Sequence, residues 1–168
     1  MTSATNASLR LRQATTADAP WLRALATHAE VARYVAYDAA DRIVAALDDN
    51  ASEVLVAEAP PGVAIGAVRV DVTNRRSRIA AIRSLMLEPA VRGRGLGLAV
   101  VRATVEWTLG ERGMHRVEAE VLDYNAAGLR TFEAAGFRRE GVRRRAYWRD
   151  EEWRDGIMFG LLAEERGR

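Results

Sequence analysis

The segment from Ile82 to Leu98 constrains the fold of this chain most, because it sets a glycine-rich basic turn between a strand and a helix. An apolar run over residues 82–87 ends at Pro89, and a helical pattern is clear from Leu98 onward. Glycines let a backbone approach an anion closely, and a helix N-terminus adds partial positive charge. We therefore expect an anionic ligand, a pyrophosphate above all, at this turn. Its residues are Arg92, Gly93, Arg94, Gly95, Leu96, Gly97 and Leu98.

The spacing of the glycines excludes two common phosphate-binding loops. A nucleotide-triphosphatase loop ends in Gly-Lys-Ser/Thr, and the chain contains no lysine. A dinucleotide fingerprint needs a third glycine where Leu98 or Val100 stands, and it usually opens the first βαβ unit. What remains is Arg92-x-x-Gly95-x-Gly97 directly after a strand. Plain helix entries also carry basic, glycine-rich turns, so a structural role for this turn alone stays an alternative.

Length and composition fit one globular domain. The chain has 168 residues, of which 49% are apolar and 29% charged, and we expect a single domain over residues 1–168 with residues 1–7 as a flexible tail. No apolar run reaches the ~20 residues of a membrane span, and the N-terminus does not resemble a secretion signal, so a cytoplasmic location is expected. With no cysteine and only two histidines, no metal site is expected.

The basic residues give a weaker indication of nucleic-acid binding. The net charge is only +2, and all 25 basic residues are arginine. A cluster precedes two aromatic residues, Tyr147 and Trp148, and such neighbours can mark a nucleic-acid surface. The cluster comprises Arg138, Arg139, Arg143, Arg144 and Arg145. Because acidic residues 150–152 follow at once and reduce the local field, nucleic acid is not the expected partner.

Hydrophobic periodicity predicts an α/β domain with a mixed sheet. Strands are expected over residues 8–13, 53–59, 65–72, 79–87, 115–122, 137–142 and 157–162. Helices are expected from about Ala17, around Tyr34, after a cap at Asp38, over 96–110 and over 126–135. The order shows neither an internal repeat nor an interdomain linker.

A second motif follows the basic turn. The strand that ends near Leu122 leads to Asn125, a short helix and then Gly136-Phe137. Near the C-terminus, residues 141–145 and Trp153-x-Asp155 precede a closing apolar strand. Together with the basic turn, this ordered set resembles the GNAT superfamily of N-acetyltransferases.

The N-terminal third narrows the resemblance. Leu-Arg-Leu-Arg-x-Ala-Thr from Leu9, and Glu30-Val-Ala-Arg-Tyr34, are similar to the ribosomal-protein N-acetyltransferase (Rim-type) branch. The resemblance covers nearly the whole chain. It implies a single-domain fold with a mixed, mostly antiparallel sheet of six to seven strands, a central splayed parallel pair and flanking helices. It also implies that two copies of the chain can form a homodimer.

The resemblance implies acetyl-CoA as co-substrate, with no metal. Backbone groups of Leu85, Met86 and Leu87 would pair with the pantetheine arm, and the N–H groups of residues 92–98 would hold the pyrophosphate. A neutral primary amine would attack the thioester directly, without a covalent enzyme intermediate. The acceptor would be a protein N-terminal α-amine or a small-molecule amine.

A base must take the proton of the attacking ammonium. Residues 116, 118, 120 and 122 share one strand face. Glu120 stands at the position of the catalytic glutamate of related ribosomal-protein acetyltransferases, and Glu118 is the second candidate. Glu120 alternatively reads as a sheet-face glutamate paired with an arginine. Asn125 is expected to hydrogen-bond the pantetheine arm or to cap the helix after it, and the two roles are compatible.

The chain departs from the family pattern at Phe132. Many GNAT enzymes carry there a tyrosine that protonates the leaving thiolate, whereas phenylalanine has no proton to give. A thiol pKa of about 8.5 makes the thiolate a tolerable leaving group without assistance. Four tyrosines remain as substitutes: Tyr34, Tyr37, Tyr124 and Tyr147. The departure also keeps open a non-catalytic domain that binds or senses acyl-CoA.

Acidic and aromatic residues are expected to flank the acceptor and to suit a cationic amine. Three tyrosines, Tyr34, Tyr37 and Tyr147, are the candidate substrate-binding residues. The early helices and the loop between the last two predicted strands contribute the other candidates: Glu30, Asp38, Trp148, Asp150, Glu151, Glu152 and Trp153. Each of these can equally be a solvated charge or a packed aromatic residue.

Overall fold

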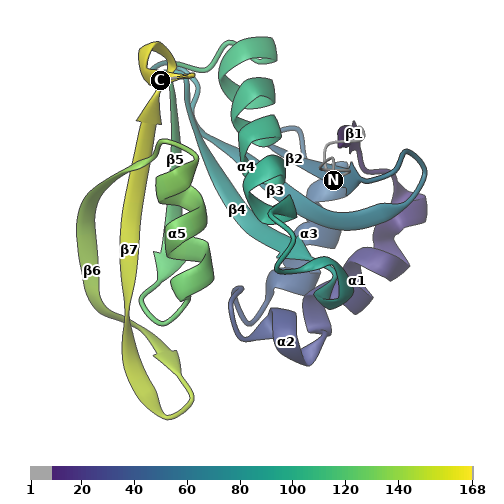
Figure 1. Ribbon diagram of the computed structural model, residues 1–168, viewed down its shortest axis with the longest axis horizontal. Helices are drawn as coiled ribbons and strands as arrows, with labels where there is room; N and C mark the ends of the chain where they lie inside the picture. The colour runs from purple at the N-terminus through teal and green to yellow at the C-terminus, as the bar shows by residue number, and fades with distance from the viewer. Residues whose placement is uncertain (1–8, 168) are drawn as a thin grey trace, which may run out of the picture.

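A seven-stranded sheet with the strand order β1-β2-β3-β4-β5-β7-β6 runs through the molecule (Figure 1). The computed structural model describes residues 9–167, so the expected flexible tail lies outside the described residues. The strands are β1 (Arg10–Gln13), β2 (Ser52–Glu58), β3 (Ala64–Asn74), β4 (Ile79–Leu87), β5 (Arg116–Leu122), β6 (Arg138–Arg149) and β7 (Glu152–Leu162). Among the strands of residues 9–167, only β4 and β5 are parallel neighbours. The predicted α/β fold with a central parallel pair is confirmed.

Alternating apolar side chains build a core on each face of the sheet. The helices are α1 (Ala19–Thr27), α2 (Ala29–Ala32), α3 (Ala39–Ala45), α4 (Leu96–Val105) and α5 (Ala126–Ala134). On β2, Leu55 packs with residues of α4 and α5, whereas its neighbour Val54 packs with residues of α1–α3. Figure 1 shows α4 and α5 in front of the sheet. No helix among residues 9–167 is long and apolar enough to cross a membrane.

The largest difference from the predicted elements lies in the last two strands. They were expected over 137–142 and 157–162, but β6 and β7 extend toward each other as a hairpin whose turn is Asp150–Glu151. Most side chains of the β6 extension are exposed, so the strand has no apolar alternation to recognise. The predicted loop is therefore an arm of paired strands, visible at the lower left of Figure 1.

The helix expected over 96–110 is also present, with a change of winding. It is α-helical to Val105 and continues as a π-helical segment over Glu106–Glu111. Gly113, at φ 64°, follows in the left-handed region that glycine tolerates. The helix thus ends close to the predicted stop signal.

The parallel strands β4 and β5 separate partway along their length. Their ladder runs from Ile79 opposite Arg116 to Ile82 opposite Ala119. Beyond it both strands continue without pairing to each other. At the point of separation, β4 carries an irregularity against β3, with Ser84 at φ 48°. A bulge of this kind bends a strand and ends its pairing. The sheet therefore opens at its centre, between α4 and α5.

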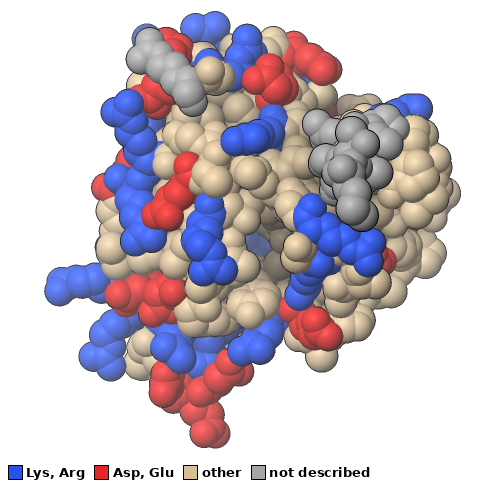
Figure 2. Space-filling view, viewed as in Figure 1, with Lys and Arg blue, Asp and Glu red and all other residues tan. Residues whose placement is uncertain are grey.

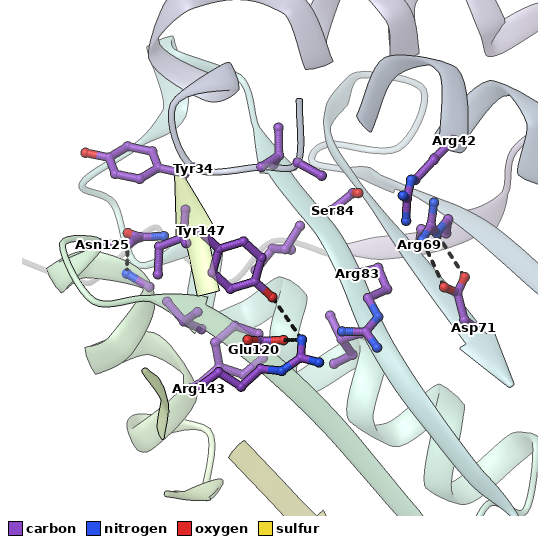
Figure 3. A pocket seen from close by; sticks show the side chains of 18 of the residues that line it. Tyr34, Arg42, Arg69, Asp71, Arg83, Ser84, Glu120, Asn125, Arg143 and Tyr147 are labelled. Carbon is purple, nitrogen blue, oxygen red and sulfur yellow. Dashed lines mark hydrogen bonds and ion pairs between the residues drawn. The ribbon is translucent and has the colours of Figure 1, made fainter. Parts of the chain in front are cut away.

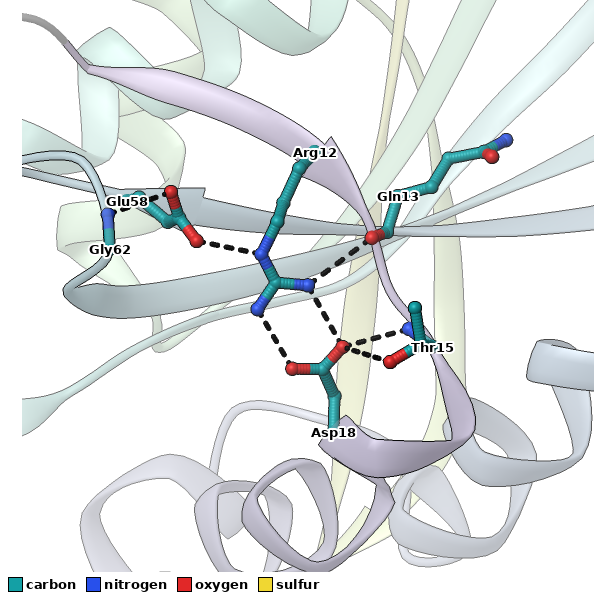
Figure 4. A network of polar contacts seen from close by, with 6 residues as sticks. All are labelled: Arg12, Gln13, Thr15, Asp18, Glu58 and Gly62. Carbon is teal, nitrogen blue, oxygen red and sulfur yellow. Dashed lines mark hydrogen bonds and ion pairs between the residues drawn. The ribbon is translucent and has the colours of Figure 1, made fainter.

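A charged network fastens the first strand to the rest of the domain (Figure 4). The Arg12 guanidinium donates to both carboxylate oxygens of Asp18, at 2.9 and 2.8 Å, and to Glu58 at 2.6 Å. The Asp18 carboxylate also accepts the backbone N–H of Thr15, at 2.7 Å. The hydrogen bond from Arg12, aided by Thr15, lowers the pKa of Asp18 from 3.8 to about 2. The network joins β1, the entry to α1 and β2.

We expect Asp18→Asn to lower the free energy of unfolding by about 2 kcal/mol at pH 7, because the pKa of Asp18 is depressed in the folded state. A depressed carboxyl pKa stabilises the fold above the unfolded value and ceases to do so as pH falls toward 2. Urea denaturation between pH 2 and pH 7 should therefore show wild type and variant converging below about pH 4. In the exposed pair Arg23–Asp41, Asp41→Asn should change stability by less than about 0.5 kcal/mol. A constant deficit of Asp18→Asn at all pH values would contradict this account.

Candidate active site

Two adjoining cavities open where β4 and β5 separate. The first, of about 420 Å³, is lined by the glycines of the basic turn, and we name it the loop cavity. The second, of about 490 Å³, is lined by Glu120 and Tyr147, and we name it the polar cavity. Four residues line both: Tyr34, Leu85, Asn125 and Gly128. The two spaces are therefore parts of one opening through the middle of the sheet.

The backbone of the basic turn forms one end of the loop cavity. Gly93 and Gly95 have φ values of 75° and 76°, in the region that side chains strain to adopt, and Gly95 precedes the first residue of α4. A Cβ at Gly97 would lie 3.4 Å from Leu87 Cδ1, so its absence keeps this part of the cavity open. The glycines expose peptide groups at the N-terminus of a ten-residue helix, an arrangement suited to an anion.

Most of the expected coenzyme residues line the loop cavity, and three do not. Those that line it are Leu85, Leu87, Arg92, Gly93, Gly95, Gly97, Leu98 and Asn125. Alternation along β4 turns Met86 to the other face, where it is 1% exposed beneath α1–α3. Leu96 packs on a small core with Val100, and Arg94 lines neither cavity. Arg130 and Thr131 of α5 also line the loop cavity and were not predicted.

Arg92 is engaged by the protein itself. Its Nη2 donates to the carbonyl oxygen of Leu87 and its Nη1 to that of Glu30, both at 3.2 Å. The Leu87 carbonyl lies at the end of β4 that no longer pairs with β5. Arg92 therefore connects this part of β4 to α2. Its side chain therefore ties the turn to β4 and α2.

Asn125 caps α5. Its Oδ1 accepts the backbone N–H of Gly128 at 2.9 Å, as the predicted capping role requires. A Cβ at Gly128 would approach Asn125 Nδ2 to 2.6 Å, so glycine lets the cap lie against the helix. Its role toward the pantetheine arm stays a prediction.

Glu120 lies in the polar cavity just past the end of the β4–β5 ladder (Figure 3). Its side chain is 15% exposed, and its Oε2 accepts Nη1 of Arg143 at 3.2 Å. Its Oε1 is buried and has no hydrogen-bond partner among residues 9–167. The same Nη1 of Arg143 donates to the Tyr147 hydroxyl at 3.2 Å. Burial, and next the neighbouring Glu120, raise the pKa of Tyr147.

Glu118 occupies a different environment from Glu120. It accepts Nε of Arg116 at 2.9 Å and lines neither cavity. At Glu118 the strand β5 is still paired on both sides, with Ala81 of β4 and Gly160 of β7. The sheet is closed there, which keeps this carboxylate away from the opening.

The three candidate tyrosines are divided between the cavity and its outer wall. Tyr34 lines both cavities and Tyr147 lines the polar cavity. Tyr37 lines neither, and its side chain is largely exposed. Its hydroxyl donates to the Trp148 carbonyl at 3.1 Å, and Arg149 stacks on its ring at 3.9 Å from the centroid. Tyr37 thus holds the hairpin arm against the helices.

The polar cavity is lined by more basic than acidic side chains, whereas acidic residues were expected to flank the acceptor. None of the acidic residues expected to flank the acceptor lines the polar cavity: Glu30 lies in α2, Asp38 directly precedes α3, and residues 150–152 form the hairpin turn and the start of β7. Five arginines and two carboxylates line it: Arg42, Arg69, Arg83, Arg143, Arg149, Asp71 and Glu120. Sequence reasoning missed most of these, although Arg69 and Arg83 interrupt apolar strands and carried a signal there.

The arginines of β6 that suggested nucleic acid are largely paired. Arg138 pairs with Glu165 at 2.8 Å, Arg139 with Glu133 at 2.7 Å, and Arg143 with Glu120. Figure 2 shows basic and acidic side chains interspersed over one face of the molecule. The described surface on this side has no large field of one sign.

A sheet whose central parallel strands separate beside a glycine-rich helix start is the architecture expected of an acetyltransferase of the GNAT type. The model of the acetyltransferase (GNAT) domain matches residues 8–138. The chain therefore belongs to this family.

Two relatives in sequence are named as acetyltransferases. The chain is 31% identical over 98 residues to a probable N-acetyltransferase, YjcK, of Bacillus subtilis, covering 58% of this chain and 54% of that protein. It is 34% identical over 133 residues to mycothiol acetyltransferase of Sanguibacter keddieii, covering 74% of this chain and 41% of that protein. The chain thus spans about half or less of these relatives.

Solved structures agree in fold over the whole domain. Spermidine N-acetyltransferase of Vibrio cholerae, in complex with CoA and spermine, has a TM-score of 0.85 at 19% identity, covering 97% of this chain and 100% of that one. A manganese complex of the spermidine/spermine enzyme SpeG from Vibrio cholerae has a TM-score of 0.80 at 20% identity, covering 96% of both chains. At this identity the likeness is one of fold.

We expect Gly156→Ala to displace the Glu120 carboxylate, because a Cβ at this position of β7 would overlap it and would lie 2.8 Å from Tyr147 Cε2. Both obstacles are movable side-chain ends, so the stability cost should stay below about 2 kcal/mol. Crystal structures and thermal melts of the variant test this. Gly141→Ala on β6, whose Cβ would lie 3.8 Å from Met158 Sδ, should leave Glu120 in place. An unmoved Glu120 in Gly156→Ala would contradict the packing argument.

Proposed function

We propose that this protein transfers the acetyl group of acetyl-CoA to a primary amine. The observation that carries the proposal is the pair of adjoining cavities, with a glycine-rich helix start in one and the Glu120 carboxylate lining the other. Membership of the GNAT family supports it. Mycothiol acetyltransferase and the spermidine N-acetyltransferases, to which the chain is similar, support an amine as acceptor.

The loop cavity fits the coenzyme. Backbone N–H groups from Gly93 to Leu98 are the donors for the pyrophosphate, and the start of α4 adds its dipole. The end of β4 that has left β5, residues 85–87, would offer its free edge to the pantetheine arm, with Asn125 opposite. Acetyl-CoA would supply an acetyl group activated as a thioester.

The polar cavity supplies the base. Arg143 holds Glu120 Oε2, and Oε1 has no hydrogen-bond partner among residues 9–167, so this carboxylate would accept the proton that the acceptor ammonium must lose, directly or through water. The amine nitrogen forms the new C–N bond as the C–S bond breaks, and the chain has no cysteine to carry the acetyl group between. Phe132 lines the cavity without a proton to donate. The leaving thiolate therefore departs unassisted or takes its proton from Tyr34 or Tyr147.

The finer assignments rest on the sequence resemblance. The Rim-type branch favours a protein N-terminal α-amine, whereas the solved neighbours favour a small-molecule amine. A homodimer and a cytoplasmic location are likewise proposals from the resemblance. An amine panel that includes a peptide with a free N-terminus decides the acceptor.

We expect Gly95→Ala to raise the Kd for CoA about tenfold, since a side chain at φ 76° strains the turn by about 1 kcal/mol and shifts the N–H groups that hold the pyrophosphate. Gly62, at φ 84° in the β2–β3 turn, has equally open surroundings and lines neither cavity. Gly62→Ala should therefore lose similar stability but bind CoA normally. Calorimetric titration compares them, and equal CoA affinity for both variants would refute the turn's role.

We expect Glu120→Gln to lower kcat for amine acetylation by about 10²–10⁴, with the Kd for CoA unchanged, because the variant keeps the shape but loses the base. Glu118→Gln should lower kcat less than about threefold, since Glu118 is held by Arg116 outside the cavities. Release of free CoA at several amine concentrations is the measurement. A loss of kcat in Glu118→Gln alone would make Glu118, and not Glu120, the base. If the wild-type protein binds CoA but acetylates no amine, the acyl-CoA-sensing alternative is favoured.

A further inference from the structure

Two arginines face each other across neighbouring strands beside the proposed acceptor site. Arg69 of β3 and Arg83 of β4 are register partners, and both line the polar cavity. Like charges placed directly opposite on a sheet are destabilising. Arg69 is 8% exposed, so water screens this pair poorly. The juxtaposition costs stability unless an anion lies against it.

The protein neutralises this pair only in part. Asp71 accepts from Arg69, with Nε and Nη2 each 2.9 Å from a carboxylate oxygen. Arg42, the third basic residue on this side, pairs with Asp38, which does not line the cavity. Among the residues drawn in Figure 3, Arg83 contacts no hydrogen-bond or ion-pair partner. The cavity lining as a whole, five arginines and two carboxylates, has three positive charges in excess.

Three of the five lining arginines lie on the wall opposite the proposed base. In Figure 3, Arg42, Arg69 and Arg83 lie on the side of β3 and β4, whereas Glu120 and Tyr147 lie on the side of β5 and β6. The space between the walls lies at the separation of β4 and β5. A molecule with a nitrogen at the Glu120 carboxylate would therefore present its far end to these three arginines.

We propose that the acceptor is a small primary amine that also carries an anionic group, a carboxylate or a phosphate. The amine lies at Glu120 and the anion lies at Arg83, with Arg69 and Arg42 beside it. A guanidinium binds either anion through two parallel N–H donors, which fixes orientation as well as affinity. This proposal rests on the proposed function and specifies its substrate class.

The same charges act against a polycation. The Vibrio cholerae neighbour binds spermine, but its identity to this chain is 19%, so its cavity residues do not transfer. In this chain a second ammonium group at the far wall would meet three arginines and one carboxylate, Asp71, which Arg69 already engages. Discrimination by unfavourable charge contacts is a common source of specificity.

Matched amines that differ only in the anion test the proposal. β-Alanine is compared with β-alaninamide, and phosphoethanolamine with ethanolamine, alongside spermidine and a neutral peptide with a free N-terminus. Release of CoA at saturating acetyl-CoA gives kcat/KM, expressed per unprotonated amine. We expect the anionic member of at least one pair to be preferred about tenfold or more, and the preferred pair identifies the anion.

The variant Arg83→Gln tests the assignment of the residue. It should raise KM for the anionic amine about tenfold, with little change in kcat and no change for the uncharged partner, since it removes binding to the part of the substrate that does not react. Arg76→Gln, in the exposed turn between β3 and β4, is the matched control and should behave as wild type. The Kd for CoA should be the same in all three proteins.

The outcomes separate this inference from the proposed function. Preference for the uncharged amines, the peptide or spermidine would overturn the inference while the acetyltransferase proposal stands. An anion preference that survives in Arg83→Gln would overturn the role of Arg83. Binding of acetyl-CoA without acetylation of any amine would contradict the proposed function, and the inference would fall with it.

Discussion

The end of the β4–β5 ladder at Ile82 and Ala119 is the constraint on which the site depends. Up to this point two parallel strands satisfy each other's peptide groups, and beyond it each strand is paired on one side only. Unpaired peptide groups in a sheet are costly unless another partner meets them. Arg92 meets one of them, the Leu87 carbonyl, and the opening exposes the rest to a ligand. Both cavities, and the position of Glu120 at the polar cavity with Glu118 outside it, follow from where the pairing stops.

The parts of the fold predicted from sequence are those in which local pattern and burial agree. Period-two apolar strands and the period-3.6 face of α4 identify the elements, and glycines that must take positive φ identify the turn. The hairpin arm was not predicted from the sequence, because its exposed strand β6 has no apolar face. The basic lining of the polar cavity could not be assembled, since Arg42, Arg69 and Arg83 lie on three different elements.

Two residues of the site, Glu120 and Asn125, combine a structural contact with a place in the cavity lining. Glu120 was expected either as a base or as a sheet-face glutamate paired with an arginine, and the structure shows the pairing with Arg143 while one oxygen remains unpartnered. Asn125 likewise caps a helix and lines both cavities. A structural role and a ligand-binding role use different atoms of the same side chain in each case. Residue type and spacing alone do not resolve such a division, because it depends on which atoms burial leaves free.

The lining shared by the two cavities has a thermodynamic consequence. Because Tyr34, Leu85, Asn125 and Gly128 contribute to both, a molecule that occupies one cavity becomes part of the wall of the other. The two binding equilibria are then linked, and linkage is reciprocal: whatever factor the first ligand applies to the affinity of the second, the second applies to the first. A domain without moving subunits can in this way couple two ligands, because their cavities share four residues at the boundary.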